Sequence, residues 1–315
     1  MLKKIPLPFA GVALAFLTLG NILQERSNGI RVLCGVIASV ILLLILVKLI
    51  TNTKQVQKEL KNPMIATSFA TFPMALMLLA VYLLPVMGVV AKVLWLVSLL
   101  FHFLLLAYIC VYFLRSFSWQ KFFTSYFVPF VGFVVASVTA PVFQMLTLGK
   151  VLFYLGFVFY LLLLLPVLYR IFIIKQLPAA AQPTNMIVAA PASLCLAGYL
   201  SSFEKPVFSL IVILLVLSIV NTFLGYYFFV KTDQKNFYPS FAAATFPFVI
   251  SALALKKATA YFAIQNAAFH GFLAPLTQIE IVIAIAACCY VLIRYAVFLL
   301  AKSPKVEKNV ANSND

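Results

Sequence analysis

Two short segments of this sequence combine residue types that suit a functional role. The tetrapeptide Ala-Thr-Phe-Pro occurs at 70–73 and again at 244–247, each time inside a long apolar stretch. A proline at such a place removes one backbone hydrogen bond and leaves a carbonyl group in need of another partner. The phenylalanine beside it, Phe72 or Phe246, would by default pack in a core or against lipid. Backbone breaks of this kind are tolerated where the chain faces protein or a water-filled cavity, so the two segments point to such a place and not to a covalent reaction.

The side chains that usually carry out catalysis or hold metals are scattered in this sequence. It has only two histidines, His102 and His270, and it has no Gly-rich phosphate loop and no cluster of carboxylates. The five cysteines all fall within apolar runs without metal-ligand spacing, which is typical of core packing. We therefore expect no enzyme activity, no metal site and no cofactor.

The composition predicts an all-α integral membrane protein. Hydrophobic residues make up 65% of the chain and charged residues 10%, with a mean hydropathy of +1.11. Repeated apolar runs of about 20 residues match the length of a helix that crosses a bilayer. The net charge of +16 comes from basic residues that flank these runs instead of forming one patch. This distribution argues against nucleic acid as a partner and in favour of membrane lipid.

The apolar runs predict ten membrane-spanning helices joined by short connections. We expect one transmembrane domain over 1–302 and a polar, disordered cytoplasmic tail over 303–315. The first run also has the features of a signal peptide, but the small-residue site lies in its middle, so we expect an uncleaved helix. The predicted spans are 6–23, 30–50, 64–84, 86–114, 122–145, 148–174, 185–202, 206–230, 238–261 and 271–300.

The basic residues also predict the orientation of the chain. Most of the 23 lysines and arginines flank the spans on the side that holds both ends of the chain. Because basic loops stay in the cytoplasm, both termini should be cytoplasmic, as an even number of spans requires. We therefore expect a multi-pass protein of the inner or plasma membrane.

The odd-numbered spans share a proline near the predicted cytoplasmic half, at intervals of about 60 residues. These spans are also rich in small residues, whereas the even-numbered spans are mostly bulky and aliphatic. The pattern predicts five helical hairpins in a quasi-fivefold arrangement, with the odd helices lining a central pore. The alternative is a set of unrelated kinks. The five prolines are Pro8, Pro73, Pro129, Pro191 and Pro247.

Four segments resemble the tellurite-resistance/dicarboxylate transporter family. They are "SFATFPMALMLLAVYL", "SYFVPFVGFVVASVTAP", "AAPASLCLAGYLS" and "SFAAATFPFVISALALKKA". The family includes bacterial tellurite-resistance proteins, fungal malate permeases and plant slow-type anion channels. The resemblance implies a homotrimer in which each protomer has ten helices around its own pore. It also implies that a phenylalanine of the ninth helix plugs the pore, at the position of Phe246 here.

The leading functional hypothesis is a passive channel for small inorganic anions, gated by Phe246 with a contribution from Phe72. No acidic residue occurs in an odd-numbered span, and Lys256 and Lys257 could attract anions to the pore mouth. The alternative for these two lysines is an interfacial pair whose charged ends reach toward water.

The second hypothesis is a proton-coupled carrier of C4-dicarboxylates such as malate. Proton coupling needs a titratable group within the membrane, and Glu280 and His102 are the candidates. Both fall in even-numbered spans, which we expect on the outside of the bundle.

Overall fold

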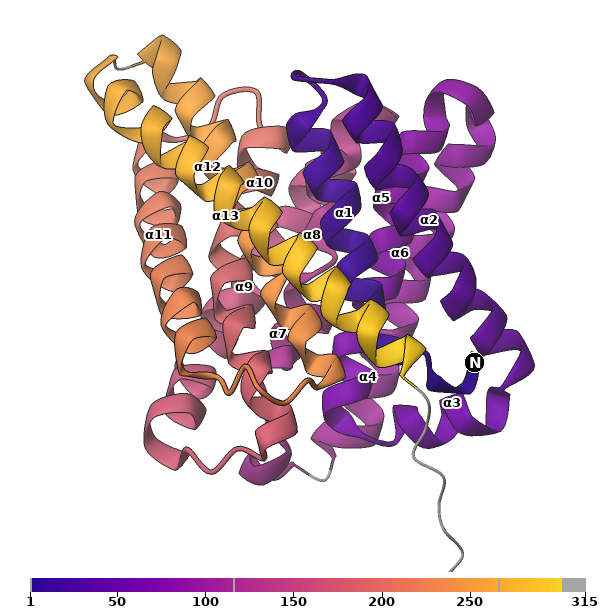
Figure 1. The fold of residues 1–315 in the computed structure, drawn as a ribbon. Coiled ribbons are helices and arrows are strands. Elements are labelled where there is room, and N and C mark those ends of the chain that lie inside the picture. The colour runs from indigo at the N-terminus through magenta and orange to yellow at the C-terminus, as the bar shows by residue number, and fades with distance from the viewer. Residues whose placement is uncertain (1, 116, 266, 302–315) are drawn as a thin grey trace, which may run out of the picture.

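Helices account for the regular secondary structure of the described residues, 2–115, 117–265 and 267–301, in this computed structural model (Figure 1). No strand occurs in these three ranges. The tail predicted over 303–315 lies outside the described residues.

Five consecutive sections of the chain each pair a buried segment with a more exposed helix. The first contains the 3-10 turns η1 (Leu2–Lys4) and η2 (Leu7–Phe9), then α1 (Ala10–Leu23), α2 (Asn28–Thr51) and α3 (Thr53–Leu60). The second contains α4 (Pro63–Phe69), α5 (Thr71–Met87), α6 (Val89–Ile109) and the π-helical η3 (Cys110–Leu114). The third contains η4 (Trp119–Lys121), η5 (Thr124–Tyr126), α7 (Phe127–Val131), α8 (Val134–Thr139), η6 (Ala140–Phe143), α9 (Leu146–Tyr169) and the π-helical η7 (Arg170–Ile174). The fourth contains η8 (Ala179–Ala189), α10 (Ala190–Ser202) and α11 (Phe208–Lys231), and the fifth contains η9 (Pro239–Ala244), α12 (Phe246–Gln265) and α13 (Ala267–Leu300).

Eight helices in the described residues are long and apolar enough to cross a membrane. A ninth arises if Thr124–Val131 and Val134–Phe143, which meet at 47°, count as one broken span. The predicted span 6–23 corresponds to Leu7–Leu23, an apolar helix shorter than the other spans. The structure therefore supports a multi-pass membrane protein, while the count of ten spans stays a prediction.

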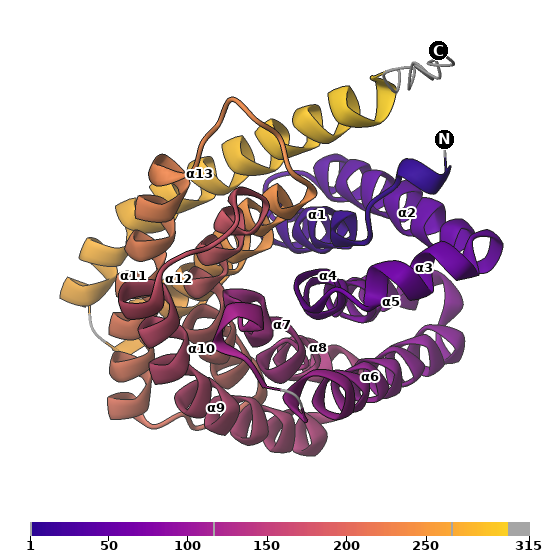
Figure 2. The same cartoon turned by 90° about the horizontal axis from the view of Figure 1, so that it is seen from below.

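The buried segments pack side by side in a closed ring. α1 contacts α5, α5 contacts α8, α8 contacts α10, α10 contacts α12, and α12 returns to α1. The longer helices α2, α6, α9, α11 and α13 lie outside this ring, as the view along it shows (Figure 2). Each outer helix contacts the inner helix of its own section and that of the next section. Segments distant in sequence thereby enclose one central axis.

Burial separates the two sets of helices. The most apolar windows of the inner segments Ala179–Ser202 and Pro239–Gln265 are 83% and 78% buried, against 28% for the outer Leu146–Ile174. The outer helices expose large aliphatic side chains such as Leu43, Leu104 and Leu162. A surface of this kind suits lipid and not water.

Each inner segment is interrupted within about one turn of its proline, by a 3-10 segment in four sections and by a break at Ala70 between α4 and α5 in the second section. Pro191 and Pro247 are the second residues of α10 and α12. The 3-10 segment η8 leads directly into α10, and η9 leads into α12 through Thr245. Pro8 lies in η2 just before α1, Pro73 is in the first turn of α5, and Pro129 lies in the short α7. Proline is tolerated there because the first turn of a helix lacks partners for its N–H groups anyway. All five prolines thus stand at breaks of inner segments.

The two ends of the described chain meet at one end of the bundle. The Lys4 ammonium donates a hydrogen bond to the carbonyl oxygen of Ala301, with Nζ and O 3.0 Å apart. This places both ends on the same side (Figure 1), as the sequence predicts. Which side of the membrane that is stays a prediction.

A buried ion pair fastens the N-terminal segment at this end. The side chain of Lys48 in α2 is fully buried, and its Nζ lies 2.7 Å from Oε1 of Glu59 in α3. The same ammonium donates to the carbonyl of Ile5, 2.6 Å away. The Gln55 amide donates both to Glu59 and to the carbonyl of Lys3. One lysine therefore holds together α2, α3 and the chain that leads into α1.

We predict that Glu59→Ala destabilises the protein, because it leaves the Lys48 ammonium buried without its counter-charge. The expected loss in the free energy of unfolding is about 3–5 kcal/mol. Thermal unfolding of the detergent-purified protein measures it, with Lys58→Ala at an exposed position of α3 as the control. The double variant Lys48→Met/Glu59→Leu should recover most of the loss, since an apolar pair of similar size needs no counter-charge. Equal melting of Glu59→Ala and Lys58→Ala would contradict this role of the ion pair.

Candidate functional site

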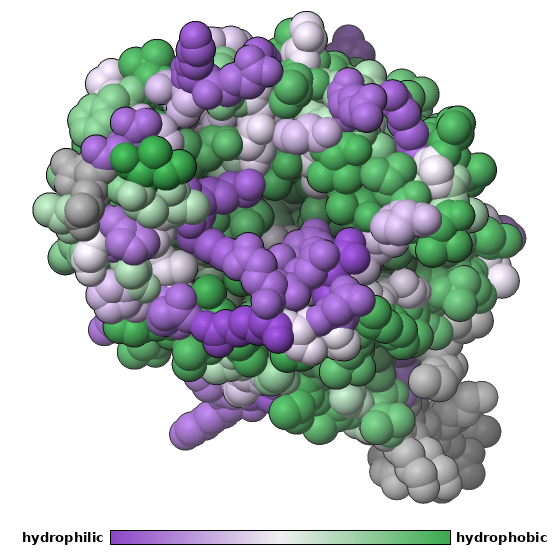
Figure 3. Space-filling model, turned by 90° about the horizontal axis from the view of Figure 1, so that it is seen from above, coloured by the Kyte–Doolittle hydropathy of each residue, from purple (hydrophilic) through white to green (hydrophobic). Residues whose placement is uncertain are grey.

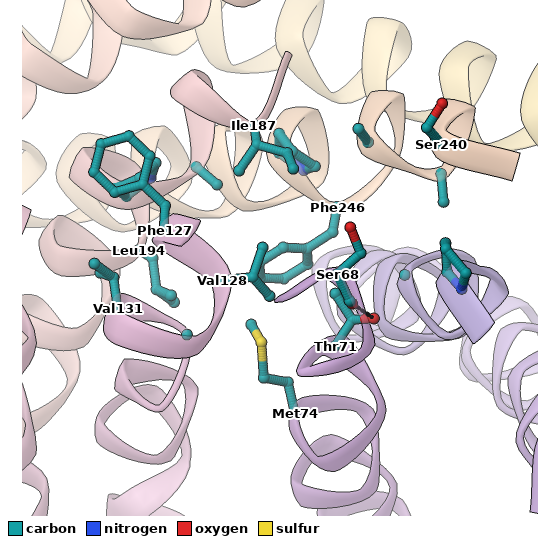
Figure 4. A pocket seen from close by; sticks show the side chains of 18 residues that line it. Ser68, Thr71, Met74, Phe127, Val128, Val131, Ile187, Leu194, Ser240 and Phe246 are labelled. Atoms are coloured by element: carbon teal, nitrogen blue, oxygen red, sulfur yellow. Dashed lines mark hydrogen bonds between the residues drawn. The ribbon is translucent and has the colours of Figure 1, made fainter. Parts of the chain in front are cut away.

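A cavity of about 50 Å³ lies on the axis of the ring, at the level of the helix breaks (Figure 4). It has room for only a few water molecules. Every inner segment contributes to its wall. The lining residues are Pro8, Gly11, Ser68, Thr71, Met74, Phe127, Val128, Val131, Gly132, Ile187, Ala190, Pro191, Leu194, Ser240, Ala242, Ala243, Phe246 and Pro247.

Phe246 reaches into this cavity from the first residue of α12. Its ring points between Val128 on one side and Ser68 and Thr71 on the other, above Met74 in the view of Figure 4. The residue is 6% exposed, so it is almost closed off from the outside. The neighbours that share the cavity are mostly aliphatic or small. A ring in this place can block the axis without being held by an aromatic cluster.

The residue before Phe246 fixes the start of α12. The hydroxyl of Thr245 is buried and lies 2.7 Å from the carbonyl oxygen of Ala242 and 3.3 Å from that of Gly11 in α1. Thr245 also leaves the helical backbone region, with φ −102° and ψ −80°. The break before Pro247 is therefore held by a side-chain hydroxyl, which sets the direction in which the next ring projects.

Phe72, the matching residue of the other tetrapeptide, does not line the cavity. Its ring stacks on Phe69 with centroids 5.4 Å apart and meets Phe101 of α6 edge-on at 6.3 Å. Phe72 is buried in this aromatic cluster between an inner and an outer helix. The structure thus brings only Phe246, of the two expected gate residues, to the central cavity.

Three of the five prolines, Pro8, Pro191 and Pro247, line the cavity, whereas Pro73 and Pro129 do not. The residue directly before the proline lines it in three sections, as Val128, Ala190 and Phe246. Aligning the five sections on their prolines would have pointed to Val128 and Ala190, which we did not predict. The cavity residues before Pro73, by contrast, are Ser68 and Thr71.

A second, wider cavity of about 230 Å³ adjoins the first toward the end that holds both termini. The two share Pro8 and Ser240 as lining residues. Lys3 and Lys4 line the wider cavity, and so does Glu59, whose charge is matched by Lys48. This vestibule is therefore net positive.

Lys256 and Lys257 lie near the opposite end of the bundle and line neither cavity. The Lys256 ammonium is 2.8 Å from Oε2 of Glu25 and donates to the carbonyl of Ile22 near the C-terminal end of α1. Lys257 is half-buried and takes part in no ion pair with a described residue. Hydrophilic residues surround a hollow on this face of the molecule (Figure 3).

His102 and Glu280 both lie away from the central cavity. The Nε2 of His102 lies 3.0 Å from the carbonyl oxygen of Pro129, so this histidine supports one of the helix breaks. Glu280 accepts a hydrogen bond from Tyr226 in a separate cavity between α11 and α13. No titratable side chain of the described residues therefore lines the central cavity. The described residues of the chain contain no group of side chains that could hold a metal ion.

We predict that Gly132→Ala destabilises the cavity wall. Gly132 occupies the break between α7 and α8, and an added Cβ would overlap the carbonyl oxygen of Val128 and the sulfur of Met74. Overpacking of this kind costs about 1–3 kcal/mol in the free energy of unfolding. The matched control is Gly271→Ala in α13, where an added Cβ meets no atom within 4 Å. Thermal unfolding of the purified variants measures the difference. A Gly132→Ala protein as stable as the control would contradict the prediction, because it would show that the cavity wall shifts to accept the added methyl group at no cost.

Comparison with protein families gives one match, and it covers nearly the whole chain. The voltage-dependent anion channel family, SLAC1, matches residues 5–296, which include every residue that lines the central cavity. A comparison with curated proteins finds no match. Members of the matched family are anion channels and related transporters. The chain therefore belongs to the voltage-dependent anion channel family, the same tellurite-resistance/dicarboxylate transporter family that its sequence resembles.

Proposed function

We propose that this protein is a passive channel for small anions, with the pathway along the axis of the ring. The observation that carries the proposal is the central cavity, which all five inner segments line and into which Phe246 projects. The helix breaks at the five prolines supply the space at this level. The path continues through the vestibule that shares Pro8 and Ser240 with the cavity.

The gate in this proposal is the ring of Phe246. The cavity of about 50 Å³ is mostly apolar, and an apolar constriction of this size loses its water and stops ions. The aliphatic neighbours of Phe246 allow the ring to turn aside without breaking a polar contact. Phe72, held between Phe69 and Phe101, has no equivalent freedom.

Preference for anions comes from charge outside the constriction. Carbonyl groups freed by the prolines would attract cations, so the selectivity must have another source. Lys3 and Lys4 in the vestibule raise the local concentration of anions at one mouth. The hydroxyls of Ser68, Thr71 and Ser240 in the cavity wall can donate hydrogen bonds to a passing anion. Lys257 is a further candidate at the opposite end.

The membrane arrangement that accompanies this proposal has ten spans as five hairpins in a quasi-fivefold ring. The eight long helices would be joined by the broken span 124–143 as the ninth span and by Leu7–Leu23 as the tenth. Both termini would be cytoplasmic, which puts the positive vestibule on the cytoplasmic side. We also propose a homotrimer with one pore in each protomer, on the basis of family membership.

The alternative, a proton-coupled carrier of C4-dicarboxylates, draws support from the membership of transporters in the family. Proton coupling is simplest when the titratable group lies on the substrate path. His102 bonds to a backbone carbonyl behind the cavity wall, and Glu280 lies in the separate cavity between α11 and α13. These positions favour the passive channel.

We predict that Phe246→Ala opens the pathway and increases anion conductance without an activating signal. The matched control is Phe72→Ala, which removes the same ring from the same tetrapeptide. It should leave conductance near that of the wild type and lower stability by about 3–5 kcal/mol, the usual cost of truncating a well-packed phenylalanine. Phe246→Ala should lose less stability, because its ring borders a cavity. Planar-bilayer recordings and thermal unfolding measure the two effects, and a folded Phe246→Ala protein with wild-type conductance would exclude this gate.

We further predict that anion flux proceeds without linked proton movement. In proteoliposomes with a pH-sensitive dye inside, a flux of chloride, nitrate or malate should cause no matching change of internal pH. Reversal potentials should follow the anion gradient alone, because a passive pathway does no other work. Malate uptake that acidifies the lumen in a fixed ratio would instead establish the proton-coupled carrier.

A further inference from the structure

A third cavity, of about 110 Å³, opens on the outside of the ring, between α11 and α13. Its floor is formed by Ser251 and Leu255 of α12, the helix that begins with Phe246. It does not share a lining residue with the central cavity. The residues that line this outer cleft are Ser218, Ile219, Thr222, Phe223, Tyr226, Ser251, Leu255, Leu276, Ile279, Glu280 and Ile283.

Glu280 is the acidic residue of the outer cleft. The residue is only 9% exposed, and its Oε2 accepts a hydrogen bond from the Tyr226 hydroxyl at 2.5 Å. Its Oε1 is buried and has no hydrogen-bond partner, a state shared in the described residues only by Nδ1 of His102. The two ion pairs among the described residues are Lys48–Glu59 and Lys256–Glu25, so Glu280 forms no ion pair with a described basic side chain. A buried carboxylate oxygen without a donor is costly, which makes a ligand with N–H or O–H groups favourable here.

The rest of the lining decides which kind of ligand fits. The hydroxyls are already bonded among themselves: Thr222 donates to Ser251, and Ser218 bonds to Ser193, each at 2.8 Å. The remaining walls are aliphatic or aromatic. A calcium ion needs about 6–8 oxygen ligands and would be short of them. An organic ammonium ion needs one anionic acceptor and an apolar wall for its carbon chain.

The cleft is reached from the lipid-facing side of the bundle. Phe223 and Ile279 line it and are 65% and 56% exposed on the outer surface. An alkylamine partitions into a bilayer and can approach by this route, whereas a strongly hydrated ion cannot. The ring of Phe223 at the opening offers an aromatic face, which attracts cations.

We propose that the outer cleft binds a primary organic ammonium ion. An N–H group of the ligand donates to the carboxylate of Glu280, and its alkyl chain packs against Ile219, Phe223 and Ile283. The ammonium comes either from a free amine or from the ethanolamine headgroup of a lipid. This binding does not depend on the proposed channel activity.

An occupant of the outer cleft would press against the back of the proposed gate helix. Ser251, on the cleft floor, donates to the carbonyl of Pro247 at 2.8 Å. Tyr226, which holds Glu280, packs its ring against Phe248 with centroids 4.8 Å apart. Both contacts lie within five residues of Phe246.

The test uses 4,4,4-trifluorobutylammonium and the full-length protein in nanodiscs of phosphatidylcholine, a lipid that has no primary amine. We expect saturable broadening of the fluorine NMR signal, reversed by butylammonium but not by 1-butanol. Glu280→Gln keeps the size of the side chain and an acceptor for Tyr226 but removes the charge. It should weaken binding about tenfold or more, the fold-change typical of losing a charge-assisted hydrogen bond. The control Glu204→Gln, at an exposed position, should bind as the wild type does.

A second variant keeps the test decisive if Glu280→Gln fails to fold. Ile283→Phe leaves the carboxylate intact and fills the outer cleft, so it should also abolish the broadening. Competition by 1-butanol equal to that by butylammonium, or unchanged binding in folded Glu280→Gln, would overturn the proposal. Adding phosphatidylethanolamine to the nanodiscs then identifies the source. Displacement of the probe assigns the site to the lipid headgroup, and no displacement assigns it to a free amine, with the ammonium site upheld in both cases.

Discussion

The arrangement of this protein depends on one constraint: a backbone polar group inside a bilayer needs a hydrogen-bond partner within the protein. Five prolines interrupt the backbone ladder, and each interruption would be costly against lipid. The broken segments therefore lie inside, where protein surrounds them, and helices without an interior proline, such as α2 and α11, lie outside. The 3-10 segments η8 and η9 are buried for the same reason. The closed ring of inner segments is the consequence, and the central cavity forms where the breaks prevent close packing.

Polar side chains then join the inner segments without exposing charge to lipid. The hydroxyl of Ser193 in α10 bonds to Ser218 of α11 and Ser251 of α12. Ser137 of α8 and Ser202 of α10 bond to each other in the same way. Each pair is worth about 1 kcal/mol or less in membrane proteins, so these contacts fix register more than they supply stability. The Lys48–Glu59 pair lies at the end of the bundle that holds both termini, where it closes the N-terminal segment.

The sequence allowed much of this plan to be predicted, because proline spacing and apolar length act locally. It predicted a helical membrane protein and the family. It did not predict that Lys256 is neutralised by Glu25, or that Lys48 joins Glu59 to the carbonyl of Ile5. Those contacts form between elements whose relative position is set by the whole ring. The sequence also did not predict how deeply Glu280 is buried, because its burial depends on how α13 crosses α11 and α12.

The two Ala-Thr-Phe-Pro segments show how a small sequence difference changes the position of the same side chain. The first reads "SFATFP" from Ser68, and the second reads "SFAAATFP" from Ser240, with two more alanines. In the first, Phe69 stands three residues before Phe72, so the two rings meet on one helical face and stack. In the second, the extra residues put Ala243 at that place, and Phe241 stacks instead on Phe237. Phe246 is left without a neighbouring ring on its own face and turns to the axis, where Ala242 and Ala243 leave space for it. The repeated tetrapeptide thus supplies the break twice, and the alanines before it decide whether its phenylalanine packs in the wall or projects into the cavity.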